Sequence, residues 1–350
     1  MESKSLKAKA YLRQGSVCYC ADFRAYDTPV LMNLELTTRC PLHCPQCYCE
    51  LLGGKDMEFD TALYWLKEAS KNNVKTINLS GGETIIYPDL EKLIKVSSDF
   101  GMETNIALSG FGVDKEKLER LIESGVSEIC ISLNGSTKEI NKKTRDGYEL
   151  AINTLQILKN MNYKKTYINW VMHSNNASDF KEMIKLAEKY NVCGFVVMVF
   201  KPDAKNQRKS VPSVVQIYEI AKCIKEYKGI VNIEVEECFS QLKAVLGKRF
   251  FTNLNQGISK GCGAGRDGIS VSVDGKLTPC RHLEIKEDFD TIRQYWENSN
   301  VLKQIRQIED NKKEPCNSCT YKNYCLPCVA VNWKMNKEIY MGEDGCAIGK

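Results

Sequence analysis

The segment VLMNLELTTRCPLHCPQCYCE, residues 30–50, joins an apolar, β-prone run to a cluster of cysteines. Cys40, Cys44 and Cys47 have the spacing C-x3-C-x2-C. Thiolates are soft ligands that suit iron-sulfur clusters or zinc, and a short irregular loop lets three sulfurs converge on one metal centre. Because a cubane of four irons has four corners, three thiolates leave one iron open for chemistry.

Zinc is the alternative metal for this loop. A closed zinc site needs a fourth nearby ligand, which Cys49 or His43 could supply. A disulfide is disfavoured, because the cysteines are clustered too tightly to pair easily and nothing marks the chain for export. The chain has 17 cysteines in 350 residues. Without export, so many cysteines indicate reduced thiols that serve as metal ligands.

The composition favours a cytoplasmic enzyme. With 43% hydrophobic residues the chain can bury a large core, and its length favours one large domain plus a smaller one. Residues 1–15 are charged and lack an apolar core of signal-peptide length, while the longest apolar run, residues 194–200, has the length of a strand. The net charge of +5 is mild and scattered. We therefore expect no membrane span and no nucleic-acid partner.

Apolar, β-prone runs alternate with amphipathic helical patterns along most of the chain. Strands separated by helices of this length pair in parallel through right-handed crossovers, so the pattern predicts a repeating βα architecture. The expected strands are residues 30–36, 75–80, 102–108, 128–133, 167–172 and 195–200, and the expected helices are residues 60–71, 89–100, 115–124, 148–160, 179–190 and 214–227.

The cysteine spacing, the aromatic Tyr48 and the position after a first strand resemble the signature of the radical S-adenosylmethionine (SAM) enzymes. In that family the amino and carboxylate groups of SAM chelate the open iron of a 4Fe-4S cluster, and an electron splits the sulfonium to give a 5'-deoxyadenosyl radical. The resemblance implies an α/β fold, a partial (β/α)6 TIM-like barrel over residues 30–230, after an N-terminal extension of residues 1–29. It makes the catalytic cluster ligands Cys40, Cys44 and Cys47.

Polar and glycine-rich strand ends extend the resemblance. The Gly81-Gly82-Glu83 run after the second strand looks like the GGE motif that holds the SAM amino group, and two glycines let a ligand approach the main chain. Asn134 stands at a strand end where the family often has Asp. Arg145 has the guanidinium fork that suits the SAM carboxylate, although a solvated arginine is the other interpretation. The expected SAM contacts are Tyr48, Gly81, Gly82, Glu83, Ser132, Asn134, Arg145 and Asn169.

The last third of the chain carries a second cysteine pattern. C-x12-G-x4-C begins at Cys262, and the Asp274-Gly275 dipeptide inside it predicts a tight hairpin. C-x2-C-x5-C-x2-C and one last cysteine follow. The whole pattern resembles the SPASM domain, a twitch-type module with two auxiliary 4Fe-4S clusters, although the second-last spacing is x2 where the family usually has x3. The resemblance implies a bridging segment, residues 231–261, and a small cysteine-rich α+β iron-sulfur domain, residues 262–350.

By carry-over from that family, two cysteine sets each bind one auxiliary cluster, giving three 4Fe-4S clusters in all. Cys262, Cys280 and Cys328 fall in the inner set, with Cys238 as the expected fourth ligand and an open, substrate-binding iron as the alternative. A zinc ribbon could mimic the later pattern. Auxiliary clusters could accept the second electron of an oxidation, since cluster potentials span about −700 to +450 mV. The outer set is Cys316, Cys319, Cys325 and Cys346.

The resemblance implies an oxidoreductase that abstracts hydrogen from a ribosomally made peptide and forms a thioether, C-C or ether cross-link. It implies as partners a peptide with a leader and a flavodoxin- or ferredoxin-type reductant. Because the barrel is expected to begin near residue 30, leader recognition is expected from a separate protein or from the barrel itself. The enzyme alternatives are oxidation of a tetrapyrrole or quinone-cofactor precursor and sulfatase-type oxidation of Cys or Ser. The latter is disfavoured, since Arg281-His282 follow Cys280 where sulfatase-maturing enzymes commonly place Asp. A non-catalytic zinc or iron-sulfur scaffold is the alternative from another class.

Overall fold

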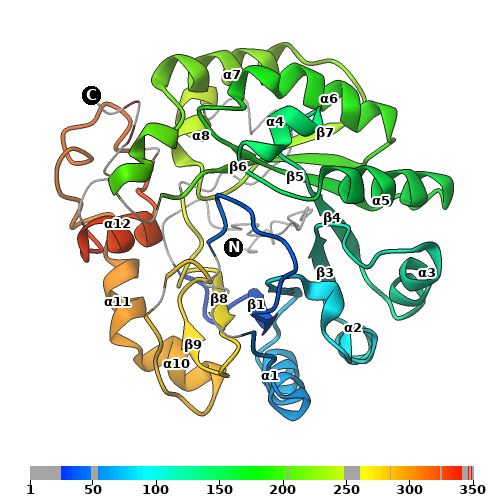
Figure 1. The fold of residues 1–350 in the computed structure, drawn as a ribbon. Helices are drawn as coiled ribbons and strands as arrows, with labels where there is room; N and C mark the ends of the chain where they lie inside the picture. Colours follow the sequence, from blue (N-terminus) through cyan, green and yellow to red (C-terminus); the bar gives the residue numbers. More distant parts are fainter. Residues whose placement is uncertain are drawn as a thin grey trace, which may run out of the picture.

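A curved, nine-stranded sheet surrounds the centre of the molecule, with helices along its outer side (Figure 1). The strands are β1 (Leu31–Thr37), β2 (Thr76–Gly81), β3 (Glu103–Leu108), β4 (Glu128–Ser132), β5 (Thr166–Met172), β6 (Gly194–Val199), β7 (Asn232–Val235), β8 (Gly268–Val271) and β9 (Leu277–Thr278). Their order is β7-β6-β5-β4-β3-β2-β1-β8-β9. All neighbours from β7 to β8 are parallel, and β8 and β9 are antiparallel.

The computed structural model describes residues 25–48, 54–202, 205–247, 261–283, 285–323, 325–340, 346 and 348. Most of the expected N-terminal extension, Cys49 and part of the expected bridging segment lie outside these ranges. None of the helices in the described ranges is both long and apolar enough to span a bilayer. The helices are α1 (Phe59–Lys71), α2 (Leu90–Asp99), α3 (Lys115–Glu123), α4 (Lys138–Lys142), α5 (Tyr148–Asn160), α6 (Phe180–Lys189), α7 (Val214–Glu226), α8 (Ser240–Leu246), α10 (Ile292–Asn298), α11 (Asn300–Arg306) and α12 (Val329–Asn336), with 3-10 turns η1 (Thr84–Ile86), η2 (Ala177–Asp179) and η3 (Lys205–Ser210).

The six predicted strands and six predicted helices are confirmed, with ends that differ by no more than one residue. They correspond to β1 to β6 and to the six longest helices between α1 and α7. The strands could be predicted because they are short β-prone runs, and the helices because each has an apolar stripe facing the sheet. The predicted hairpin is also present as β8 and β9, and Gly275 has the left-handed φ of +77° that its turn requires.

One strand, β7, and one pairing, that of β8 with β1, were not predicted. β7 lies in the segment expected to be a bridge, and its sequence NIEV is short and half polar. β8 lies in the C-terminal cysteine-rich segment, yet it pairs in parallel with β1, from Leu31↔Gly268 to Leu34↔Val271. The barrel sheet therefore continues past residue 230, and the cysteine-rich segment contributes one of its strands.

The two faces of the sheet have different chemistry. Apolar residues such as Leu34, Ile77 and Leu79 are fully buried in one large core shared with the outer helices. Alternate positions face the other way, and three of these, Asn33, Asn78 and Asn105, stand next to one another in register on β1, β2 and β3. The inner face of the barrel is therefore polar at this level.

These asparagines form a ladder across four neighbouring strands. Asn78 donates to Asn33 Oδ1 at 3.0 Å, and Asn105 donates to Asn78 Oδ1 at 3.4 Å. Asn33 in turn donates to Ser270 Oγ on β8 at 3.3 Å. Because Asn78 and Asn105 are each 1% exposed, losing a partner would leave buried amide groups without hydrogen bonds.

Replacing Asn78 with Ala should therefore lower the free energy of unfolding by about 1–3 kcal/mol, the cost of unpaired buried polar groups. Urea unfolding followed by circular dichroism measures the change. Asn153→Ala is the control, because Asn153 is exposed on α5 and should change stability by less than about 0.5 kcal/mol. Equal stability of the two variants would contradict a structural role for the ladder.

Candidate active site

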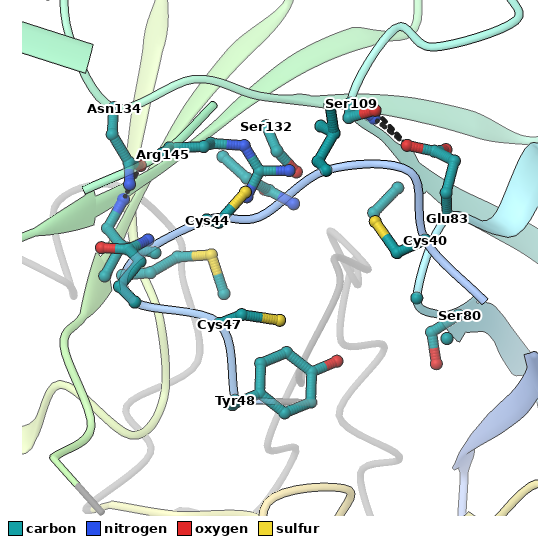
Figure 2. Close-up of a pocket in the computed structure, with 18 of the residues that line it drawn as sticks. Cys40, Cys44, Cys47, Tyr48, Ser80, Glu83, Ser109, Ser132, Asn134 and Arg145 are labelled. Carbon is teal, nitrogen blue, oxygen red and sulfur yellow. Dashed lines mark hydrogen bonds between the residues drawn. The ribbon is translucent and has the colours of Figure 1, made fainter. Parts of the chain in front are cut away.

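A pocket opens at the carboxyl ends of the parallel strands, the end at which βα barrels carry their chemistry. The loop after β1 brings Cys40, Cys44 and Cys47 to it, and Figure 2 shows the three side chains along this loop beside Tyr48. The Cys47 N-H donates to the Cys44 carbonyl at 3.0 Å, which closes a turn between these two thiols. Burial raises the pKa of the Cys40 thiol, and the nearby Glu83 and the other two thiols raise it further.

The cysteine loop rests directly on the glycines that end β2. The Gly82 N-H donates to the Thr37 carbonyl at 2.7 Å, and the Glu83 N-H donates to the Arg39 carbonyl at 2.9 Å. A Cβ on Gly81 would lie 2.3 Å from the Thr37 carbonyl oxygen, and one on Gly82 would lie 2.2 Å from that of Arg39. The backbone at the end of β1 and the start of the cysteine loop thus packs against these two glycines, while the predicted close approach of a ligand to them stays a prediction.

Arg39, which was not among the residues predicted from the sequence, stabilises the start of this loop through its side chain. Its guanidinium makes a two-point ion pair with Asp56 at 2.9 and 2.6 Å, and it donates to the Ile86 carbonyl at 3.2 Å. The Thr38 N-H donates to the Lys55 carbonyl at 2.8 Å. These contacts of Arg39 and Thr38 therefore hold the start of the cysteine loop in place without a contribution from a bound metal.

Among the described residues that line the pocket, Glu83 is the one carboxylate, and 2% of its surface is exposed. Oε2 accepts from the Ser109 N-H at 3.0 Å and from the Ser109 hydroxyl, the contact dashed in Figure 2. Oε1 has no hydrogen-bond partner among the described residues. Burial raises the pKa of Glu83 more than Ser109 and Arg145 lower it. The site thus presents a carboxylate oxygen that lacks a donor.

Arg145 reaches the same pocket from the turn after α4. Its backbone is held by Asn141, which accepts from the Arg145 N-H through its carbonyl at 2.8 Å and donates to the Arg145 carbonyl at 2.9 Å. The buried Nε of Arg145 has no acceptor among the described residues. A donor and an acceptor of opposite charge, Arg145 Nε and Glu83 Oε1, are therefore both available in one pocket.

The remaining predicted SAM contacts also line the pocket. Ser132 and Asn169 are paired in register on β4 and β5. Asn134 lines it too, but its side chain is already used: Oδ1 accepts from the Val171 N-H at 3.0 Å, and Nδ2 donates to Thr144 Oγ1 at 3.1 Å. Asn134 therefore fixes the loop after β4 to β5, whatever else it contacts.

The structure also brings Cys238 to the predicted inner cysteine set. Cys238 Sγ lies 3.7 Å from Cys262 Sγ. Hydrogen bonds from the Cys262 and Cys328 thiols hold the pKa of Cys238 well below its usual value. Burial, with Cys238 nearby, raises the pKa of Cys280 to about 11. Cys238 and the other three cysteines of the inner set are thus close enough to shift one another's pKa values.

A buried ion pair stands between this inner set and the pocket. Lys201, a pocket residue, lies 2.8 Å from Glu236, and their side chains are 8% and 6% exposed. Lys201 also lowers the pKa of Cys238. The two sites are therefore adjacent.

The outer set is less tightly assembled. The Cys319 N-H donates to the Cys316 carbonyl at 3.4 Å, so these two share a turn. Cys325 and Cys346 each pack against the large apolar core. Among the described residues, no three Cys, His, Asp or Glu side chains are arranged to hold a single metal ion.

Comparison with known proteins identifies the family. Residues 34–187 match the Radical SAM superfamily. The PqqA peptide cyclase of Ruegeria pomeroyi is 30% identical over 315 residues, which are 84% of this chain and 80% of that protein. The chain belongs to the radical SAM superfamily. Membership confirms the predicted family and enzyme class, and it implies a 4Fe-4S cluster and SAM as cofactors.

Two further proteins extend the likeness. The AdoMet-dependent heme synthase of Methanosarcina barkeri is 24% identical over 332 residues, 87% of this chain and 92% of that protein. Structures of Streptococcus suis SuiB, one bound to S-adenosylmethionine and one to the precursor peptide SuiA, match with a TM-score of 0.72 and 18% identity. They cover 91% of this chain and 77% and 76% of theirs. This match confirms the α/β partial-barrel fold of the radical SAM superfamily.

The pocket fits the cofactors of the superfamily. Three thiols on one loop suit a cluster with one open iron. The unpaired Glu83 Oε1 could accept a hydrogen bond from an ammonium group, and the unpaired Arg145 Nε could donate to a carboxylate. SAM carries both groups on one carbon.

Gly82→Ala should displace the cysteine loop, because the added Cβ meets the Arg39 carbonyl oxygen at 2.2 Å. We expect a loss of about 1–3 kcal/mol in unfolding free energy and at least about tenfold weaker SAM binding by the reconstituted protein. Gly101→Ala is the control. Its Cβ meets nothing within 4 Å, so its left-handed φ of +74° should cost stability without changing SAM affinity. Unchanged SAM affinity in Gly82→Ala would contradict the docking role.

Proposed function

We propose that this radical SAM enzyme modifies a peptide, most directly by forming a cross-link within it. The observation that carries the proposal is the 30% identity, over 84% of the chain, to a PqqA peptide cyclase. The SuiB fold match, solved with the precursor peptide SuiA, also supports a peptide substrate. A thioether, a C-C bond and an ether are all compatible with this support.

A bound 4Fe-4S cluster and SAM would supply the one-electron chemistry that removes a hydrogen atom from a substrate C-H bond. The residues of this chain would bind and position these two groups. Cys40, Cys44 and Cys47 would hold the cluster, Glu83 would accept from the SAM ammonium, and Arg145 would donate to its carboxylate. Further contacts come from the pocket residues Tyr48, Gly81, Gly82, Ser132, Asn134 and Asn169.

We further propose that the C-terminal segment is a SPASM domain with two auxiliary 4Fe-4S clusters. The approach of Cys238 to Cys262, 3.7 Å between sulfurs, supports Cys238 as the fourth ligand of the inner set. For the outer set, Cys316, Cys319, Cys325 and Cys346, the support is sequence spacing. A low-potential flavodoxin- or ferredoxin-type protein would supply the electrons.

Oxidation of a tetrapyrrole is the second candidate. The heme synthase of Methanosarcina barkeri favours it, since the alignment covers 92% of that protein. The two substrates are told apart by mass spectrometry after turnover with candidate peptides or tetrapyrroles, where an oxidative cross-link removes two hydrogens from the peptide.

The test of SAM chemistry uses anaerobically reconstituted protein reduced with dithionite. Wild type should release 5'-deoxyadenosine, and Cys40→Ala should reduce this to background. Cys262→Ala should lose about four irons per chain but still cleave SAM, because its cluster is not the SAM site. The control is Cys223→Ala, at a half-buried position on α7 outside both sets. Undiminished cleavage by Cys40→Ala would overturn the proposal.

Glu83→Gln should weaken SAM binding about 10- to 100-fold, because it removes the charge from the hydrogen bond to the ammonium while keeping the shape of the side chain. Equilibrium dialysis with labelled SAM measures the affinity. Glu68→Gln is the matched control, since Glu68 is also buried but pairs with Lys71 on α1. Equal SAM affinity in the two variants would exclude Glu83 as the ammonium acceptor.

A further inference from the structure

The turn after β9 places two side chains in the SAM pocket from the far end of the chain. The Leu283 N-H donates to the Cys280 carbonyl at 2.9 Å, and the His282 N-H donates to Cys280 Sγ at 3.3 Å. Arg281 and His282 lie within this turn, and both line the pocket that the cysteine loop occupies. They therefore stand between the SAM site and the inner cysteine set, where a substrate must lie if it is to reach both.

Arg281 forms no ion pair with an acidic side chain among the described residues. Arg39 forms an ion pair with Asp56, while Arg266 and Arg306 donate to backbone carbonyls. Arg281, by contrast, is half-buried, and its guanidinium carbon lies 5.3 Å from the centre of the Tyr48 ring. Within the described ranges, no carboxylate oxygen comes within ion-pair distance of it. A partly buried guanidinium without a carboxylate partner is available to pair with an anionic ligand that enters the pocket.

The acidic groups nearest to Arg281 in electrostatic influence are Glu236 and Glu35. Glu236 is already engaged by Lys201, at 2.8 and 3.0 Å. Of the lysine and arginine side chains that line the pocket, Lys201 is therefore already neutralised by Glu236, whereas Arg281 has no carboxylate within ion-pair distance among the described residues.

His282, next to Arg281 on the same side of the pocket, has a second polar group without a hydrogen-bond partner among the described residues. Its ring packs on Tyr48, with centroids 4.2 Å apart, and its buried Nδ1 has no hydrogen-bond partner among the described residues. Tyr48 thus orients both neighbours, since the Arg281 guanidinium and the His282 ring lie against the same aromatic ring. A planar, forked donor held in this way suits two-point binding of a carboxylate.

SAM does not need this arginine for its amino-acid part, because Glu83 Oε1 and Arg145 Nε already offer one acceptor and one donor for those groups. We therefore expect the substrate, and not SAM, to supply the anionic partner of Arg281.

We propose that Arg281, with His282 beside it, recognises a carboxylate of the substrate and so sets specificity for an acidic group next to the carbon that loses hydrogen. The inference rests on the proposed function, in that the substrate is modified in this pocket. An acidic peptide side chain and the propionate of a tetrapyrrole both carry this chemistry, and the test separates the two sources.

The probes are N-acetylglutamate amide and its uncharged match, N-acetylglutamine amide, titrated into reconstituted, SAM-loaded enzyme and followed by ligand-observed NMR. The glutamate probe should bind at least about tenfold more tightly than the glutamine probe. Arg281→Gln should remove this preference, and Arg281→Lys should keep part of it. Arg293→Gln, at an exposed α10 arginine paired with Glu297, is the control and should match wild type.

SAM affinity and 5'-deoxyadenosine release are measured on the same samples. Unchanged SAM affinity in Arg281→Gln shows a folded pocket and supports a substrate role. The proposal is overturned if wild type binds the two amino-acid probes equally and also binds coproporphyrin and its uncharged tetramethyl ester equally. The wild-type probe comparison decides the matter even if the variants do not fold. Failure of wild type to cleave SAM would instead count against the proposed function.

A third probe identifies the source of the carboxylate. Coproporphyrin carries propionates, and its tetramethyl ester lacks their charge. If Arg281→Gln weakens coproporphyrin binding but not binding of the ester, the carboxylate is a tetrapyrrole propionate; if only the glutamate probe responds, it is a peptide side chain. If neither responds to Arg281→Gln, the proposal is wrong.

Discussion

The contact between the cysteine loop and the end of β2 is the constraint on which the rest of the site depends. Two consecutive backbone hydrogen bonds, from Gly82 to Thr37 and from Glu83 to Arg39, place the loop on a surface where a side chain has no room. The second of these bonds is made by the Glu83 N-H itself, so it also sets the position of the Glu83 carboxylate in the pocket. Metal ligands and cofactor acceptor are therefore fixed relative to each other by main-chain geometry, which is stiffer than side-chain packing.

The inner face of the barrel is polar where the strands β1, β2, β3 and β8 lie side by side. A closed eight-stranded barrel fills its interior with branched apolar side chains. Here the asparagine ladder on β1, β2 and β3 and the serine on β8 occupy inward positions, and the pocket lies beyond them. The hydrogen bonds between these side chains pair most of the buried amide groups of the ladder, while Asn105 Oδ1 has no partner among the described residues. The interior at this level is therefore lined by polar groups rather than filled by apolar ones.

The sequence predicted β1 to β6, their helices and the cysteine loop well, because those elements depend on local periodicity and spacing. It did not predict β7, whose four-residue sequence is short and half polar, and it did not predict that the first strand of the expected hairpin, β8, pairs in parallel with β1, because local periodicity carries no information on such a distant partner. Cys238 was expected near the inner set from its place between the two regions, and the structure places it 3.7 Å from Cys262. Ser109 and Arg39 were missed, since only the three-dimensional contact with Glu83 or Asp56 gives them a role, although a serine directly after β3 was a usable signal.

The parallel pairing of β8 with β1 has a consequence for how the chain is made. Asn33 and Ser270, which touch across this pair, are 237 residues apart in the sequence. During synthesis, β1 is exposed on that side as an unpaired edge until most of the polypeptide has left the ribosome, and such edges invite association with other chains. Because the two strands are so far apart in the sequence, their pairing is expected to be the slow step of folding. Chaperone protection of the nascent barrel would matter most before this step.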